Sequence, residues 1–372
     1  MASNEFVGRL IAATDGTLDE IAAGLREFDP AEVAVAVLGE VLARAPQFDG
    51  PAEPFVVQFE LGANSYLVTL NEGKIEPGRL DEPWLVIRQD LAELVQAVFG
   101  PSCDHVTRDV FFKEEPGPTT WQQDDPWLGP RAEATKAAHQ VLKACSVYHA
   151  DLDTLAVRFD TDKWGGHWYT PHYQRHFAAY QAKRVTVLEI GIGGYDLPDV
   201  GGGSLLMWKH FFRRGLVYGL DIYDKTGLDQ PRLQTIKGDQ NDPVFLEQLG
   251  QSIGPIDIVV DDGSHLTEHV VTSFNALFPH VRPGGLYVIE DLQTSYWPGY
   301  GAGESMGLLK TLLDGLHHQE QVHPVTPGHT DLNIDSITFH HNIAFIHKGR
   351  NSEPGAPSWI SRTGEAVQSW TP

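Results

Sequence analysis

The stretch from Val187 to Tyr195, Val-Leu-Glu-Ile-Gly-Ile-Gly-Gly-Tyr, decides the fold. Its apolar start predicts a buried β-strand, and the glycines that follow predict a tight turn before the next element. In an open α/β sheet, ligands bind beside such a turn, at the carboxyl ends of the strands. A glycine turn alone is equally typical of an ordinary loop. The stretch therefore predicts a nucleotide-like pocket only if neighbouring strands also end in polar residues.

Beyond residue 180, short β-rich runs alternate with helical stretches, which predicts an α/β fold with a Rossmann-like doubly wound sheet. The last two runs are separated by only three residues, so we expect them to form a terminal antiparallel hairpin. A parallel sheet that ends in such a hairpin is the plan of class I methyltransferases. The predicted strands are Val185–Ile190, Val217–Ile222, Leu233–Ile236, Ile256–Val260, Leu286–Ile289, Ile337–Phe339 and Ile343–Ile346.

The residues around the turn fit S-adenosylmethionine better than NAD. A dinucleotide fingerprint needs a third glycine where this chain has Asp196, and a ribose-binding acid about 20 residues further on, whereas Asp221 lies further away. Asp221 ends the second predicted strand, from which a carboxylate can accept both ribose hydroxyls of S-adenosylmethionine. Other predicted contacts are small or polar: Gly191 and Gly193 at the methionine end, and Asp239 and Gln240 near the adenine.

Acidic residues end the fourth and fifth predicted strands. Asp262 follows the fourth strand, and Glu290 and Asp291 follow the fifth. If these strands are parallel neighbours, the three carboxylates converge on one edge of the sheet, where they would repel one another without a cation. Oxygen ligands suit Mg²⁺ or Mn²⁺. The alternative for each single acid is that it caps the following helix.

A histidine in the same turn is the predicted general base. His265 lies three residues after Asp262, and an imidazole can take a proton from a hydroxyl near neutral pH. His269 follows one helical turn later. The chain has 17 histidines, most of which we expect to be structural, so position alone favours His265.

The first third of the chain predicts a separate, smaller α+β auxiliary domain. Helical spacing from Thr17 to Ala45 is interrupted at Asp29-Pro30, and two apolar runs flank Gly62 as in a β-hairpin. The segment 113–130 is rich in proline, glycine and acid, a composition typical of linkers. The predicted division is an auxiliary domain at 1–112, a linker and connecting helix at 113–150, and a methyltransferase domain at 151–372.

Composition limits the partners and the location. With 27 basic and 50 acidic residues the formal net charge is -23, which disfavours nucleic acid and anionic membranes. No apolar run reaches the roughly 20 residues that span a bilayer, and no signal segment opens the chain, so we expect a cytoplasmic protein. Cys103 and Cys145 are too few to form a disulfide framework and are interpreted as buried or idle thiols.

The motifs of residues 159–291 resemble the metal-dependent sugar O-methyltransferases of macrolide antibiotic pathways. The resemblance rests on Thr161–Lys163, His167–Tyr173, Leu188–Gly191, Gly201–Ser204, Gly238–Asp242, Asp261–His265 and Tyr287–Asp291. It implies Asp262, Glu290 and Asp291 as metal ligands, His265 as base, and Glu189, Gly191, Ser204, Asp221, Asp239 and Gln240 as cofactor contacts.

The resemblance also implies a substrate and an assembly. The acceptor would be a small glycoside with a rhamnose or another deoxyhexose, and the enzyme a homo-oligomer, either a dimer or a tetramer. Two alternatives stay open from the residues themselves. A catechol-like phenol would use the same metal and carboxylates, and a non-catalytic binding module would need neither.

Overall fold

The computed structural model describes residues 3–45, 55–70, 72–101, 106–112, 137–146, 150–301, 303–321 and 326–360. The chain divides into two compact units. The first comprises residues 1–185, 203–217 and 226–234, and the second comprises 186–202, 218–225 and 235–372. The predicted linker at 113–130 lies outside the described residues; of the predicted connecting helix, residues 137–144 are described and helical.

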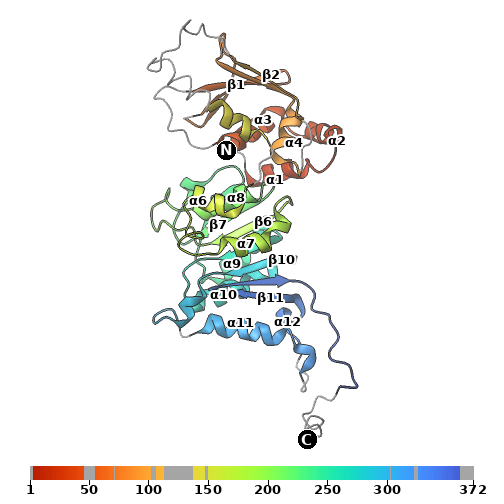
Figure 1. Ribbon diagram of the computed structural model, residues 1–372, viewed down its shortest axis with the longest axis vertical. Coiled ribbons are helices and arrows are strands. Elements are labelled where there is room, and N and C mark those ends of the chain that lie inside the picture. The colour runs from red at the N-terminus through yellow and green to blue at the C-terminus, as the bar shows by residue number, and fades with distance from the viewer. Residues whose placement is uncertain are drawn as a thin grey trace. The chain divides into compact units, whose positions relative to one another are not determined.

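The N-terminal part of the first unit is an α+β structure, as predicted (Figure 1). Its five-stranded sheet has the order β3-β2-β1-β4-β5, in which β1 pairs with β2 antiparallel and with β4 parallel. Buried apolar side chains from the helices and the sheet form one core. The elements are α1 (Asn4–Ala12), α2 (Leu18–Gly24), η1 (Leu25–Glu27), α3 (Pro30–Arg44), β1 (Val56–Leu61), β2 (Asn64–Thr69), β3 (Lys74–Pro77), β4 (Leu85–Gln89), α4 (Leu91–Phe99) and β5 (Arg108–Phe112).

Local sequence explains the start of α3. The Asp29 side chain accepts hydrogen bonds from the backbone N–H groups of Ala31 and Glu32, and Pro30 occupies the first turn, where its missing N–H costs nothing. The predicted break at Asp29-Pro30 is therefore a helix start.

A buried charge network joins α3 to later segments of the first unit. Glu40, fully buried on α3, accepts from Arg232 Nη2 at 2.6 Å and from Arg44 Nε at 2.9 Å, and lies 3.7 Å from Lys209 Nζ. Arg232 also donates to the carbonyl oxygens of Lys209, Phe212 and Gly215. The network ties the auxiliary segment to the helix that follows the glycine turn.

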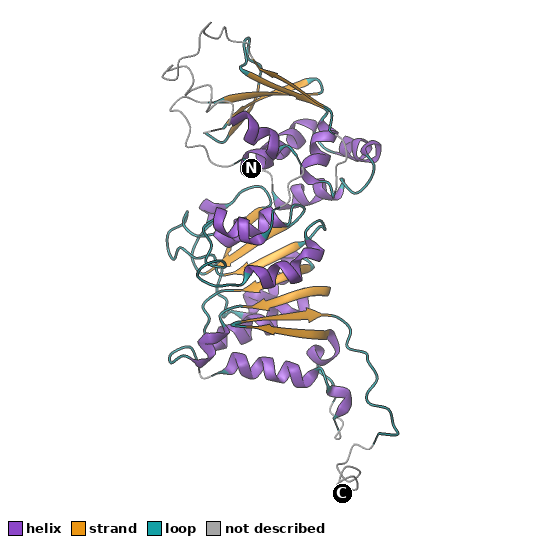
Figure 2. Cartoon of the chain, viewed as in Figure 1, coloured by secondary structure: helices purple, strands orange, loops and turns teal. Residues whose placement is uncertain are grey.

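The seven-stranded sheet has the order β11-β12-β10-β9-β6-β7-β8 (Figure 2). Strands β6, β9 and β10 are parallel neighbours, and β11 and β12 form the predicted antiparallel hairpin at one edge. This is the class I methyltransferase plan. The strands are β6 (Thr186–Ile190), β7 (Leu216–Asp221), β8 (Leu233–Lys237), β9 (Ile256–Asp261), β10 (Val281–Ile289), β11 (Ile334–His340) and β12 (Ile343–Lys348).

Helices alternate with the strands of this sheet along the chain. Helix α10 packs against β9 and β10 and against α9 and α11, around a core of buried apolar side chains. The bounds are α6 (Leu152–Arg158), α7 (Thr170–Phe177), η2 (Ala178–Tyr180), α8 (Gly203–Phe211), η3 (Thr226–Leu228), α9 (Pro243–Ile253), α10 (Thr267–Leu277), η4 (Phe278–His280), η5 (Leu292–Tyr296), α11 (Glu304–Gly315), η6 (His318–Glu320) and α12 (His329–Asn333).

Two further expectations concern single features. In the ranges that the structure describes, no helix is long and apolar enough to cross a membrane. Cys145 is a buried free thiol, and burial raises its pKa to about 11, so it is unreactive at neutral pH. Cys103 lies outside the described residues.

Candidate active site

Two glycines after β6, Gly191 and Gly193, differ in what surrounds them. Gly191 has a φ of +90°, and a Cβ there would lie 2.1 Å from the carbonyl oxygen of Asp262. Its missing side chain therefore lets the turn pack against the end of β9. Gly193 has a φ of +75°, and a Cβ there would meet nothing within 4 Å. The space beside Gly193 is therefore open.

Asp221 ends β7 and faces the glycine turn. Its Oδ2 accepts from the Ile192 N–H at 2.9 Å, and its Oδ1 accepts from the Tyr223 N–H at 2.9 Å. The half-buried carboxylate is thus fixed in place, and each oxygen keeps a lone pair that can accept a hydroxyl. This position suits a carboxylate that binds a ribose.

The other predicted cofactor contacts lie in different surroundings. Asp239 is exposed and accepts from the Asn241 N–H at 2.7 Å, whereas Gln240 is buried and bonded to residues of β9 and its turn. Glu189 is fully buried on β6. Ser204 lies in the first turn of α8, in the first compact unit, whereas the other predicted contacts belong to the second.

A group of side chains that could hold a metal ion lies at the ends of β9 and β10. One ligand atom from each of Asp262, His265 and Asp291 lies within 4.8 Å of the others, and His265 Nε2 is 3.5 Å from Asp291 Oδ2. His265 and Asp291 have left-handed backbones, with φ values of +57° and +53°. Strained conformations of this kind concentrate at functional sites. The two carboxylates fit Mg²⁺ or Mn²⁺, with His265 beside them.

Glu290, the third predicted ligand, is not in this group of described residues. It is buried, and its N–H continues the ladder from β10 to the Asp261 carbonyl oxygen at 3.0 Å. Asp291, which is in the group, has a left-handed backbone, so the chain leaves the extended conformation of β10 between the two acids. The role of Glu290 as a ligand stays a prediction, and so does the assignment of His265 as base rather than ligand.

Asp261 lies in one of the motifs that carry the family resemblance, but the sequence assigned it no role. Its fully buried carboxylate accepts from Gln240 Nε2 at 2.7 Å, from Ser273 Oγ and from Tyr287 Oη at 3.3 Å. Burial raises the pKa of Asp261 to about 6, although the hydrogen bonds from Ser273 and Tyr287 oppose the shift. The polar network lies directly behind Asp262. Only the polar character of Ser273 on a buried helix face signals it in the sequence.

An exposed aromatic segment follows the metal group. The side chains of Tyr296 and Trp297 are 74% and 52% exposed, and the rings of Trp297 and Tyr300 meet edge to face with centroids 6.1 Å apart. The segment begins five residues after Asp291. It offers an apolar surface close in sequence to the ligands.

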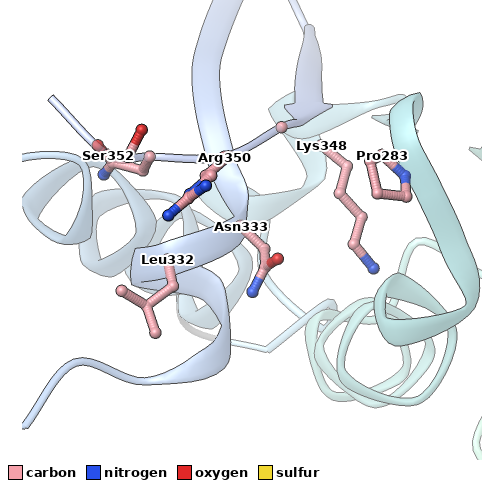
Figure 3. A pocket seen from close by; sticks show the side chains of 8 residues that line it. Pro283, Leu332, Asn333, Lys348, Arg350 and Ser352 are labelled. Atoms are coloured by element: carbon pink, nitrogen blue, oxygen red, sulfur yellow. The ribbon is translucent and has the colours of Figure 1, made fainter.

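A separate pocket lies at the end of the sheet where the parallel strands begin (Figure 3). Its lining includes Pro283 at the start of β10 and Lys348 at the end of the antiparallel β12. Lys348 Nζ donates to the carbonyl oxygens of Phe278 and Pro279 at 2.8 and 2.9 Å. These residues are remote from the carboxyl ends of the parallel strands, so this pocket is not the candidate active site.

The fold defines a class I methyltransferase, and the residues at the ends of β9 and β10 form a group that could hold a metal ion. Residues 7–108 match the family model described as MycE methyltransferase N-terminal. The chain is 43% identical to demethylmacrocin O-methyltransferase of Streptomyces fradiae, over 97% of this chain and 95% of that one. It therefore belongs to the family of S-adenosylmethionine-dependent sugar O-methyltransferases that acts in macrolide and polyketide pathways.

Two further relatives support membership of the same family. The chain is 48% identical to 8-demethyl-8-alpha-L-rhamnosyl tetracenomycin-C 2'-O-methyltransferase of Streptomyces olivaceus, over 78% of this chain and 77% of that one. The structure of MycE methyltransferase from the mycinamycin biosynthetic pathway, in complex with Mg, SAH and mycinamycin VI, matches with a TM-score of 0.82 and 40% identity, over 100% of both chains. The predicted fold and the resemblance to the sugar O-methyltransferases of macrolide pathways are confirmed.

Proposed function

We propose that the protein transfers a methyl group from S-adenosylmethionine to a sugar hydroxyl of a glycosylated natural product, with the help of Mg²⁺ or Mn²⁺. The grouping of Asp262, His265 and Asp291 beside the glycine turn carries this proposal. The relatives support it, because one acts on a rhamnosyl tetracenomycin and the MycE structure holds Mg and SAH with mycinamycin VI.

Different residues of the chain have different roles in the proposed reaction. His265 Nε2 accepts the proton of the reacting hydroxyl, whose oxygen forms a bond to the methyl carbon as the carbon–sulfur bond of the sulfonium breaks. The products are the methyl ether and S-adenosylhomocysteine. When bound, the divalent ion lowers the pKa of the hydroxyl. Asp262, Glu290 and Asp291 would hold that ion, and the cofactor would be held by Glu189, Gly191, Gly193, Ser204, Asp221, Asp239 and Gln240.

The aromatic segment supports a deoxysugar acceptor. A rhamnose or another deoxyhexose carries a methyl group and apolar C–H faces, which pack well against exposed aromatic rings such as Tyr296 and Trp297. A catechol-like phenol would also stack there, so the sugar assignment depends on the relatives rather than on the rings.

The proposal also covers the oligomeric state, the cellular location and the domain boundaries of the protein. The family resemblance supports a homo-oligomer, which sedimentation would test. The acidic composition and the family's small-molecule substrates support a cytoplasmic enzyme without nucleic-acid or membrane partners. The proposed division is 1–112, 113–150 and 151–372; the matched N-terminal family model at 7–108 supports the first of these segments.

The decisive experiment is turnover against rhamnosylated and other deoxyhexosyl polyketides, with the product detected by mass. We expect methylation of the sugar with Mg²⁺, loss of turnover after exhaustive chelation, and recovery when Mg²⁺ or Mn²⁺ is restored. Full turnover after chelation would contradict the metal role. Methylation of catechols but of no sugar would favour the phenol alternative.

Asp221→Ala is expected to weaken binding of S-adenosylmethionine about 10- to 100-fold, because a carboxylate that accepts hydroxyl hydrogen bonds is lost. Calorimetry measures the affinity. Mn²⁺ affinity should stay nearly unchanged, because Asp221 is on β7, away from the metal group. Asp221→Asn is the matched variant, since it keeps an acceptor for the Ile192 N–H but loses the charge. Unchanged cofactor affinity in both variants would exclude the ribose-binding role.

A further inference from the structure

The carboxamide of Gln240 connects two parts of the site. It is 7% exposed and comes from the loop between β8 and α9, where adenine binding is proposed. Its Nε2 donates to Asp261 Oδ1 at 2.7 Å, and its Oε1 accepts from the Ser264 N–H at 3.0 Å. Both ends of the carboxamide therefore bond to residues that flank Asp262.

The turn after β9 is held from two sides. On one side, the Asp262 N–H donates to the Ile190 carbonyl oxygen at 3.0 Å, and Gly191 packs against the Asp262 carbonyl. On the other side, Gly263 packs so closely on Gln240 that a Cβ there would lie 2.2 Å from Oε1. The turn carries Asp262 and His265, and His265 has a left-handed backbone that its surroundings must maintain.

We infer that Gln240 is a positioning residue, which fixes the Asp262–His265 turn and thereby sets the geometry of the metal ligands and the base. Partners behind the ligands of a metal ion usually decide how well the ligands are oriented. This inference rests on the proposed function. Gln240 then has two proposed roles. One is the cofactor contact, and the other is to fix the turn through its carboxamide.

Gln240→Met tests the inference, because methionine keeps the volume of the side chain and removes both hydrogen bonds. Hydrogen–deuterium exchange of the peptide that covers 261–266 should become about 2- to 10-fold faster in the protein without ligands, the loss expected for one or two hydrogen bonds. Mn²⁺ affinity, followed by electron paramagnetic resonance, should fall about 10- to 100-fold. S-adenosylhomocysteine affinity should fall less than Mn²⁺ affinity, because the carboxamide of Gln240 is bonded to Asp261 and Ser264.

Thr272→Val is the matched control. Thr272 Oγ1 bonds to Asn241 Oδ1 at 3.0 Å, so this variant also loosens the loop after β8 but leaves the turn after β9 untouched. It should leave exchange of the 261–266 peptide and Mn²⁺ affinity as in the wild type. Equal exchange in Gln240→Met and Thr272→Val would overturn the inference, as would a loss of cofactor affinity with unchanged exchange.

Gly263→Ala reaches the same contact from the other side. Its methyl group would displace the flexible end of Gln240 without altering residue 240, and it should reproduce the faster exchange. This variant decides the question if Gln240→Met does not fold. Because exchange is measured without metal or substrate, it judges the inference even if the wild type binds no Mn²⁺, a result that would instead refute the proposed function.

Discussion

His265→Ala is expected to lower kcat about 10²- to 10⁴-fold at saturating cofactor, metal and acceptor near neutral pH, the range for loss of a general base. His265 Nε2 lies 3.5 Å from Asp291 Oδ2, so the imidazole is beside the proposed metal ligands, where the proposed mechanism places the reacting hydroxyl. Single-turnover kinetics with mass detection separate this chemical step from product release.

His269→Ala is the matched control for His265. His269 is one helical turn further along, and its Nδ1 is 2.8 Å from Ser264 Oγ, but it is outside the ligand group. We expect a far smaller loss of rate. The Mn²⁺ affinity of His265→Ala then distinguishes two roles, since a base can be removed without loss of metal binding. A variant that no longer binds the ion would identify His265 as a ligand, and one that keeps most of its rate would exclude both roles.

Glu40→Gln is expected to destabilise the protein by about 3–5 kcal/mol, the cost of breaking a buried ion network by removing one partner. Arg44, Lys209 and Arg232 all face this carboxylate, and all are nearly or fully buried. Without it their charges lose the counterion that they share among the described residues, and burial already lowers the pKa of Lys209 to about 7. Urea unfolding measures the loss.

The contribution of Glu40 should depend on pH in a definite direction. Burial raises the pKa of Glu40, but the charges of Arg232, Lys209 and Arg44 outweigh burial and hold it below its ordinary value of 4.5. The stability that it supplies is therefore fully present above pH 4.5 and is lost as the pH falls further, because the unfolded chain takes up the proton first. The difference between wild type and Glu40→Gln should shrink accordingly.

The exposed pair Lys74–Glu76 provides the control for this prediction. Its ion pair, at 2.9 Å, is as short as the pair of Arg44 with Glu40. Both of its side chains are about half exposed, so Glu76→Gln should have little effect on the free energy of unfolding. Equal losses for Glu40→Gln and Glu76→Gln would mean that burial does not govern the network.

Local sequence was sufficient for the elements and for the edge where the site lies. The Val187–Tyr195 stretch predicted a strand and a glycine turn, and both are present because apolar runs and glycines act over a few residues. The short gap before Ile343 predicted the terminal hairpin for the same reason. Asp221, Asp262 and Asp291 could be placed because the carboxyl ends of parallel strands must share an edge.

Only the tertiary structure decided which side chains meet. Gln240 and Asp261 are 21 residues apart, and Glu40 and Arg232 are 192 apart, so no local pattern records either pair. The same holds for Glu290 and Asp291: the sequence gives no sign of which of two adjacent acids faces His265, because this depends on the direction of the chain at the end of β10. The sequence by itself determined the elements and their chemistry, whereas packing determined the partners, since contacts between distant residues arise only once the sheet has formed.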